Sequence, residues 1–201
     1  VDFTADLVVW SGKFSKSSVD IKEAYSLLEE DNKKVQKYLT SKGISEDNIV
    51  FEAVKTNFVY EDNYSSGGKY IGRKMIGYKL SQRVSINSKN VEAVEKISRE
   101  VTELINQGIN FYSESPSYYY TKLADLKLQL IQKATEDAYN RAENIAKSSN
   151  SKLGKLIDAR MGIFQITGQY SNEDYSWGGV FNTSSKNKTA SITVHLEYKV
   201  K

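Results

Sequence analysis

His195 is the single histidine of the chain, so it is the only imidazole that could act as a general base. A serine hydrolase would place it beside a nucleophilic serine, but the Gly-x-Ser-x-Gly turn that often presents such a serine is absent. His195 instead alternates with Thr193, Glu197 and Lys199, the polar positions of a strand-like segment. We therefore expect a solvent-exposed strand residue, and an uncharacterised hydrolase is the most distant alternative.

Phosphate and metal chemistry have no better support in the sequence. Gly67-Gly68 and Gly178-Gly179 lie in polar stretches and open neither a P-loop nor a Gly-x-Gly-x-x-Gly turn. Residues 29–31 are Glu, Glu and Asp without the pattern of a calcium loop, so we expect a solvated helix face there. The absence of cysteine removes thiolate nucleophiles and cysteine-rich zinc sites. We expect no enzyme activity, no catalytic residues, no metal and no cofactor.

The aromatic residues are the more promising candidates for a functional surface. Fourteen tyrosines is a high number for this length, and aromatic residues gather around Pro116 and in the segment Gly168 to Lys188. Strand packing explains most of them, because tyrosine suits half-buried strands. In loops, however, such rings supply large contact area at low entropic cost. The candidate contact residues for a partner or ligand are Tyr170, Tyr175, Trp177, Phe181, Tyr118 and Tyr119.

The first part of the chain predicts a strand, a helix and a long hairpin. Apolar residues run through residues 3–14, and helical spacing follows from about Asp20 to Gly43, a glycine suited to ending a helix. Residues 49–60 and 69–86 are rich in β-branched and aromatic residues, and the stretch between them is polar. This pattern predicts a hairpin with long arms.

The second part predicts two more helices and three more strands. Helical stripes run from about Asn90 to Gly108 and from about Tyr119 to Ser149, with a short strand between them. Residues 155–167 and 189–200 read as the last strands, and residues 168–188 as a long Gly/Ser/Asn-rich aromatic loop. The order βαββαβαββ predicts an α+β fold in which three helices cover a mixed, mainly antiparallel sheet. We expect a single domain over residues 1–201.

Composition limits the classes of partner. The chain is 39% hydrophobic and 26% charged, and its formal charge of +3 comes from interspersed residues rather than a basic run, so we expect no nucleic-acid partner. No stretch approaches the roughly 18 consecutive apolar residues of a membrane-spanning helix, so we expect no transmembrane segment. The chain starts at Val1 rather than at a methionine, which is consistent with removal of a signal peptide.

Several short motifs, taken in order, resemble the SIMPL family, also called DUF541. They are Val9-Trp10-Ser11-Gly12-Lys13-Phe14, Lys42-Gly43-Ile44, Gly77-Tyr78, the set Ala138, Arg141, Ala142 and Ala146, and Leu153-Gly154-Lys155. The resemblance extends from about Phe3 to Tyr198. Trp10-Ser11-Gly12 replaces the Gly-x-Gly pair of many members, and the loop of residues 168–188 is longer than usual.

The resemblance implies a bacterial periplasmic or outer-membrane-associated protein, in some cases linked to envelope stress tolerance, without an established catalytic residue set. On that basis we expect an exported, non-enzymatic domain that forms homo-oligomers or docks another envelope protein through its hairpin and aromatic loop. The alternative is a module that binds a small ligand, a glycan or a peptidoglycan fragment with Tyr175, Trp177 and Phe181.

Overall fold

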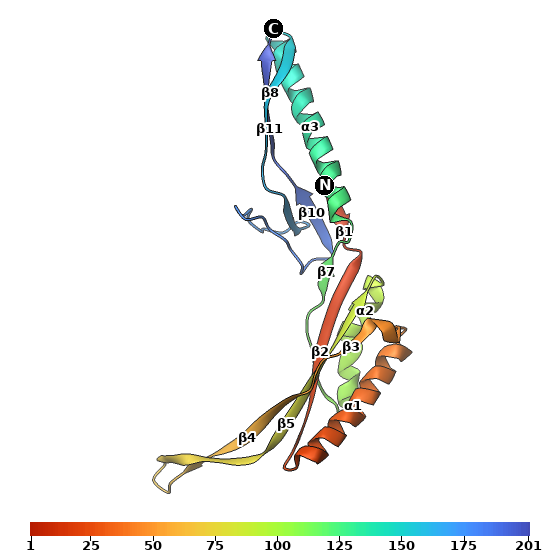
Figure 1. The fold of residues 1–201 in the computed structure, drawn as a ribbon, viewed down its shortest axis with the longest axis vertical. Helices are drawn as coiled ribbons and strands as arrows, with labels where there is room; N and C mark the ends of the chain where they lie inside the picture. The colour runs from red at the N-terminus through yellow and green to blue at the C-terminus, as the bar shows by residue number, and fades with distance from the viewer. The chain divides into compact units, whose positions relative to one another are not determined.

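The computed structural model describes all residues from 1 to 201, and their contacts gather in two compact units (Figure 1). The hairpin unit is Leu7–Ser117, and the loop unit combines Val1–Asp6 with Tyr118–Lys201. The single domain expected from the sequence stays a prediction, because a division of contacts does not show whether the units unfold separately.

The sheet of the hairpin unit is built around one long strand. β2 (Leu7–Ser18) pairs with β5 (Tyr70–Ser88) on one side and with β6 (Asn110–Ser113) on the other, both antiparallel. β3 (Ile49–Phe51) and β4 (Lys55–Tyr64) pair with the far edge of β5. The long hairpin predicted from the sequence is therefore the β4–β5 pair.

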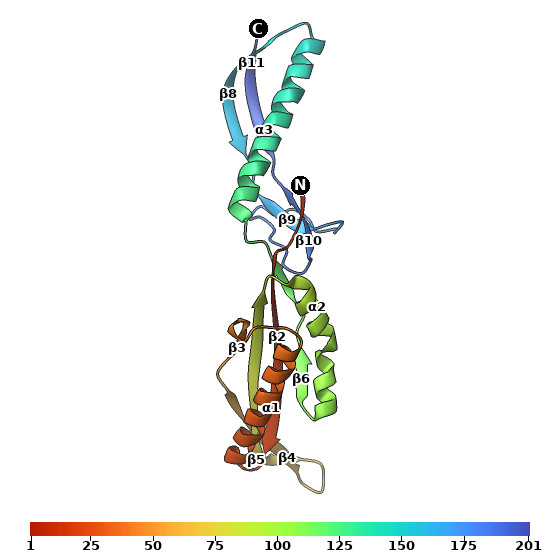
Figure 2. The same ribbon diagram turned by 90° about the vertical axis from the view of Figure 1, so that its right-hand side faces the viewer.

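Two helices lie against β2 and β5 (Figure 2). α1 (Ile21–Ser41) begins at Asp20, whose side chain accepts the amides of Lys22 and Glu23, and η1 (Glu46–Asn48) follows it. α2 (Val91–Glu100) continues into η2 (Val101–Gln107). The helices and the sheet share an apolar core of Val8, Trp10, Phe14, Leu28, Val35, Leu39, Leu80, Val84, Ile86, Val94, Ile97 and Leu104. Burial of these side chains is the main stabilising contribution in this unit.

The loop unit has two antiparallel ladders. β1 (Asp2–Thr4), β10 (Asn187–Ser191) and β9 (Gln165–Gly168) form one sheet in that order. β8 (Leu153–Met161) and β11 (Val194–Val200) form the other.

One long helix accompanies these ladders. The short strand β7 (Ser117–Tyr119) precedes α3 (Leu123–Ser148). Near its start, Leu126 and Leu130 pack with Ile166 and Ala190 of the three-stranded sheet. Further along, the rings of Tyr139 and Tyr198 meet edge to face, with centroids 5.9 Å apart. The helix therefore contributes to both ladders.

The structure confirms the predicted class, α+β with three helices and mainly antiparallel strands. The strands form three sheets rather than the single sheet expected. The first predicted strand is interrupted at residues 5–6, where β1 joins a different sheet from β2, and the last two predicted strands are interrupted at residues 162–164 and 192–193. Apolar residues continue through the last two interruptions, so the periodicity could not reveal them.

None of the three helices is both long enough and apolar enough to cross a lipid bilayer.

Candidate functional site

The outer part of the β4–β5 hairpin, residues 58–78, is an arm of only two strands (Figure 1). The last residue of β2 that pairs with β5 is Ser18, opposite Tyr78, so between Tyr70 and Gly77 β5 pairs with β4 alone. Both edges of the arm thus carry backbone N–H and C=O groups that no third strand bonds. Two strands alone are marginally stable in water, and open edges are templates for pairing.

One face of the arm carries a row of exposed aromatic side chains. Phe58 lies opposite Tyr78, with ring centroids 5.7 Å apart, and Tyr64 lies near Tyr70, with centroids 5.8 Å apart. Between these pairs Tyr60 is opposite Met75. The exposed fractions of Phe58, Tyr64 and Tyr70 are 57%, 60% and 52%. We call Phe58, Tyr60, Tyr64, Tyr70, Met75 and Tyr78 the aromatic face.

Charges of opposite sign are divided between the two strands of the arm. Glu61 and Asp62 lie on β4, opposite Lys74 and Arg73 of β5. The Arg73 guanidinium also lies over the Tyr60 ring, 4.2 Å from its centroid. In this part of the arm β4 is therefore acidic and β5 is basic.

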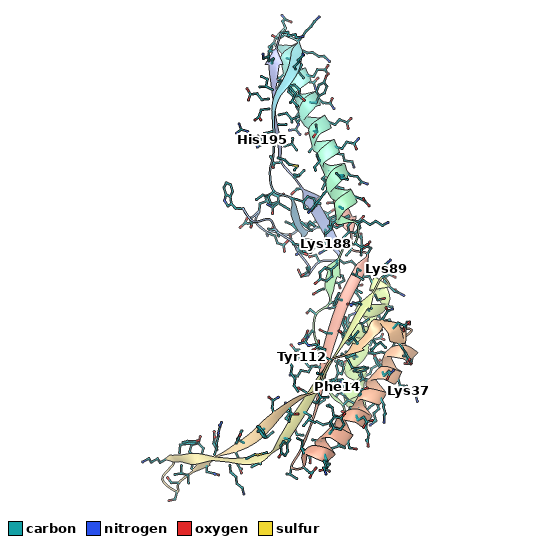
Figure 3. All side chains as sticks on the ribbon, viewed as in Figure 1. Phe14, Lys37, Lys89, Tyr112, Lys188 and His195 are labelled. Atoms are coloured by element: carbon teal, nitrogen blue, oxygen red, sulfur yellow. The ribbon has the colours of Figure 1, made fainter.

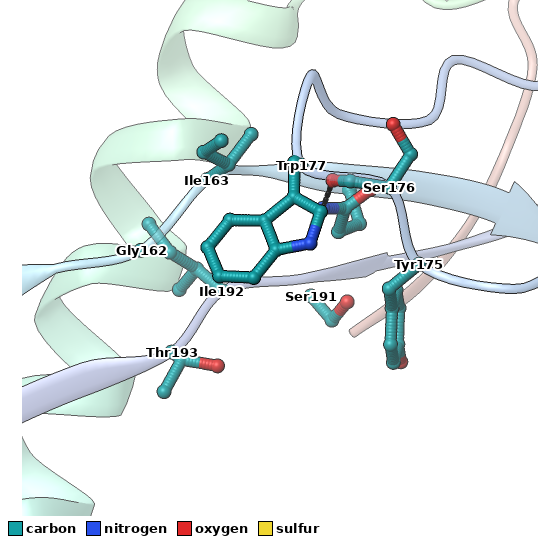
Figure 4. A pocket seen from close by; sticks show the side chains of 9 residues that line it. Gly162, Ile163, Tyr175, Ser176, Trp177, Ser191, Ile192 and Thr193 are labelled. Carbon is teal, nitrogen blue, oxygen red and sulfur yellow. Dashed lines mark hydrogen bonds between the residues drawn. The ribbon is translucent and has the colours of Figure 1, made fainter.

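A second candidate site lies in the loop unit, where the strands are interrupted (Figure 4). An open hollow of about 370 Å³ has Ile163 and Ile192 from the two interruptions and Tyr175 and Trp177 from the aromatic loop in its wall. The Trp177 side chain is 96% exposed, and Figure 4 shows its indole and the Tyr175 ring on two sides of the hollow. Ser191 and Thr193, which both carry hydroxyl groups, also line the hollow.

Hydrogen bonds from the Gln165 side chain and within a turn hold the loop segment that carries Trp177. The Gln165 side chain is almost completely buried; its Nε2 donates to the Ser176 carbonyl at 2.8 Å, and its Oε1 accepts the Val180 amide at 2.6 Å. The Gly179 amide donates to the Ser176 carbonyl at 3.0 Å, and Gly179 has the positive φ of 87° that closes this turn. The indole is thus exposed on a fixed backbone.

A buried lysine connects both ends of the aromatic loop (Figure 3). Lys188 is only 2% exposed, and its Nζ donates to the backbone carbonyl of Asn182 and, at 3.1 Å, to Asn182 Oδ1. Asn182 Nδ2 donates to Glu173 Oε1 at 2.5 Å, and Glu173 Oε2 accepts the Gly168 amide at 2.8 Å. We call Glu173, Asn182 and Lys188 the loop latch.

Burial lowers the pKa of Lys188, and the negative charge of Glu173 opposes that shift. The pKa of Glu173 is lowered by the Gly168 amide first and then by Asn182. Burial therefore disfavours the charged form of Lys188, whereas hydrogen bonds favour the charged form of Glu173.

The structure brings two of the six aromatic residues predicted as contacts into one site. Tyr175 and Trp177 line the hollow, whereas Tyr170 is 94% exposed and outside it. Phe181 forms a bridge with Ile166 and is half exposed. The last two, Tyr118 and Tyr119, are partly buried in β7, and the Tyr118 amide donates to the Thr183 carbonyl at 2.7 Å. Their contact roles stay predictions.

The sequence did not identify two groups of residues now seen at these sites. Ile163 and Ile192 line the hollow only because their strands are interrupted, which no local pattern shows. The aromatic face could have been predicted from the sequence. Phe58, Tyr60 and Tyr64 are separated by even numbers of residues, so their side chains share one face of a strand.

The remaining candidates for chemistry are placed as follows. His195 is exposed opposite Arg160 on an open strand face (Figure 3), and Arg160 is itself paired with Asp158 at 2.7 Å.

Asp31, expected on a solvated helix face, is 1% exposed and lies 3.2 Å from Lys16 Nζ. That expectation was wrong, because helix spacing turns Asp31 toward the sheet beside Leu28 and Val35. No cluster of three or more His, Asp or Glu side chains suited to a metal ion occurs.

The match to known families covers nearly the whole chain. The model of the SIMPL family, described as a protein of unknown function (DUF541), matches residues 1–198. The comparison with curated proteins gave no match. Both units described above, with the arm and the loop, fall within the matched range apart from the last three residues. The chain therefore belongs to the SIMPL family.

Proposed function

We propose that this protein is a non-enzymatic domain of the bacterial cell envelope that self-associates through its hairpin arm. The observation that carries the proposal is the aromatic face, a row of half-exposed large side chains on a two-stranded arm. Exposed apolar patches of this kind mark interaction surfaces, and Tyr and Phe anchors are typical of them. The alternative of a partner protein is an outcome of the test below.

A second copy of the chain is the occupant that the charges of the arm favour. The outer edge of β4, with Glu61 and Asp62, can pair with the outer edge of β5, with Arg73 and Lys74, in the next copy. Such pairing bonds the open backbone groups and brings the aromatic rings of neighbouring copies side by side on one face. Because the two edges differ, the contact is head-to-tail, and it produces a ring or an open chain of copies.

The proposed envelope location and role in stress tolerance rest on family likeness rather than on the geometry. Export is tested by fractionating cells that produce the full-length precursor. Recovery of the mature protein in the periplasmic or outer-membrane fraction is expected, and exclusive recovery in the cytoplasm would contradict the location.

Analytical ultracentrifugation of the purified protein tests self-association. We expect a concentration-dependent increase in mass for the wild type, and its loss in Phe58→Ser/Tyr64→Ser. The matched control is Tyr112→Ser, which removes a 68% exposed tyrosine from β6 of the same unit, away from the arm (Figure 3). Each of the two aromatic side chains makes a cross-strand contact worth up to about 1 kcal/mol in such an extended sheet, so the double variant should weaken association by about tenfold or more.

Two results would contradict the proposal. One is a wild-type protein that stays monomeric at about 1 mM, where an association worth about 4 kcal/mol is already visible. The other is association that survives in the double variant as in the control, which would mean that copies meet at another surface. Stable monomers that bind a different envelope protein through the arm would support the partner alternative instead.

A further inference from the structure

The hollow beneath Trp177 has features that self-association of the arm does not explain. Trp177 is the most exposed large hydrophobic side chain of the chain, at 96%. An indole exposed to that degree adds nothing to the core, yet the backbone that carries it is fixed by Gln165 and by the turn at Gly179. A ring carried on a fixed backbone is suited to stacking on a ligand, because little backbone entropy is lost on binding.

The wall of the hollow combines apolar and uncharged polar groups. Ile163, Ile192 and the indole supply apolar surface, and Tyr175, Ser191 and Thr193 supply hydroxyl groups that both donate and accept hydrogen bonds. None of the lining residues carries a charge. The volume of about 370 Å³ is at the small end of the range for small-molecule sites.

The lining of the hollow can be compared with three classes of ligand: a charged ligand, a purely apolar side chain and a sugar ring. A charged ligand would find no counter-charge in the wall. A purely apolar side chain would cover the hydroxyl groups without bonding them, which is costly. A sugar ring has C–H groups on one face, which are attracted to the negative face of an aromatic ring, and hydroxyl groups at its rim.

We propose that this hollow binds an uncharged carbohydrate, with one sugar ring stacked on Trp177 and its rim hydroxyls bonded by Tyr175, Ser191 and Thr193. The loop latch contributes by holding the ends of the loop, so that the site is formed before the ligand arrives. The site lies within the loop unit and is independent of self-association by the arm in the hairpin unit.

Tryptophan fluorescence gives a direct test, because the chain has two tryptophans in opposite environments. Trp10 is fully buried and Trp177 almost fully exposed, so acrylamide quenches mainly Trp177. Neutral trisaccharides, one of N-acetylglucosamine and one of glucose, are titrated into the wild-type protein. We expect at least one of them to protect Trp177 from quenching in a saturable manner.

Calorimetric titration of variants with the same trisaccharides identifies the site. Trp177→Ala should weaken binding by about tenfold or more, as removal of an aromatic stacking platform commonly does. The matched control is Tyr170→Ala, which removes a 94% exposed ring of the same loop that does not line the hollow, and it should bind like the wild type. Both side chains are exposed, so neither change should unfold the protein, as circular dichroism will verify.

Three results would overturn the proposal. Neither trisaccharide protects Trp177, or Trp177→Ala binds as tightly as the wild type, or the neutral amino-acid derivative N-acetylphenylalaninamide protects Trp177 while the sugars do not. The last result would assign the hollow to an aromatic side chain of a peptide.

Discussion

Replacement of Lys188 by methionine tests whether the loop latch holds the aromatic loop. Methionine keeps most of the length of the side chain but removes the ammonium group that donates to two oxygens of Asn182. Because Lys188 is 2% exposed, water cannot readily replace those hydrogen bonds. A buried acceptor left without a partner costs about 1–3 kcal/mol, and removing the desolvation cost of the ammonium offsets part of this loss. We expect the loop to be destabilised by a net amount of about 1–2 kcal/mol.

Hydrogen exchange at the Gly168 amide measures this loss most directly. That amide donates to Glu173, the far end of the latch, at 2.8 Å. A loss of about 1–2 kcal/mol corresponds to exchange that is about 5- to 30-fold faster, if exchange proceeds through local opening. The control is Lys155→Met, an exposed lysine on β8, for which we expect no change at Gly168. Equal exchange rates at Gly168 in Lys188→Met and in the wild type would refute the role of the latch.

The same substitution has a predicted pH dependence. The pKa of Lys188 is lowered in the folded protein, so between that pKa and the unfolded value of 10.5 the unfolded chain binds more protons. Stability of the wild type should therefore rise, relative to Lys188→Met, as the pH increases through this alkaline window. Unfolding titrations of both proteins at several alkaline pH values check the sign, and an unchanged difference between them would contradict it.

Two further predictions concern the hairpin unit. Gly12→Ala would place a Cβ 2.3 Å from Phe111 Cζ in the core, so we expect a loss of about 1–3 kcal/mol in denaturant unfolding, and unchanged stability would show that the ring moves freely. Ser11 and Arg83 lower the pKa of Glu114, so its contribution to stability is present above pH 4.5 and is lost as the pH falls through the lower folded value. Glu114→Gln should flatten that acidic dependence in unfolding titrations, and an equally steep dependence in both proteins would be inconsistent with this assignment.

The helix boundaries show how much of the fold local sequence signals could predict. Gly43 and Gly108 were expected to end helices, and both have the positive φ of such positions, 89° and 76°. Asp20 and Asn90 cap α1 and α2 through their side chains. These features depend on residues close together in the chain, which is why spacing alone reveals them.

The interruptions of the strands and the loop latch depend on contacts between distant residues. The Gly162 amide donates to the Thr193 carbonyl at 2.8 Å, across 31 positions of sequence, where the two ladders separate. The burial of Lys188 could have been predicted, because Lys188 lies two residues before Ala190 and therefore on the same, inward side of β10. A lysine at an inward position requires a buried acceptor, but the sequence does not show that Asn182 provides it.

The central claim, that copies of the chain meet at the hairpin arm, is tested most directly by hydrogen exchange at two protein concentrations. The backbone amides of residues 58–64, on the outer strand of the arm, are followed in dilute and in concentrated protein, with the amides of α1 as internal reference. We predict that the arm amides become more protected at the higher concentration while those of α1 do not change. Equal exchange of the arm amides at both concentrations, in samples that do associate, would contradict the account.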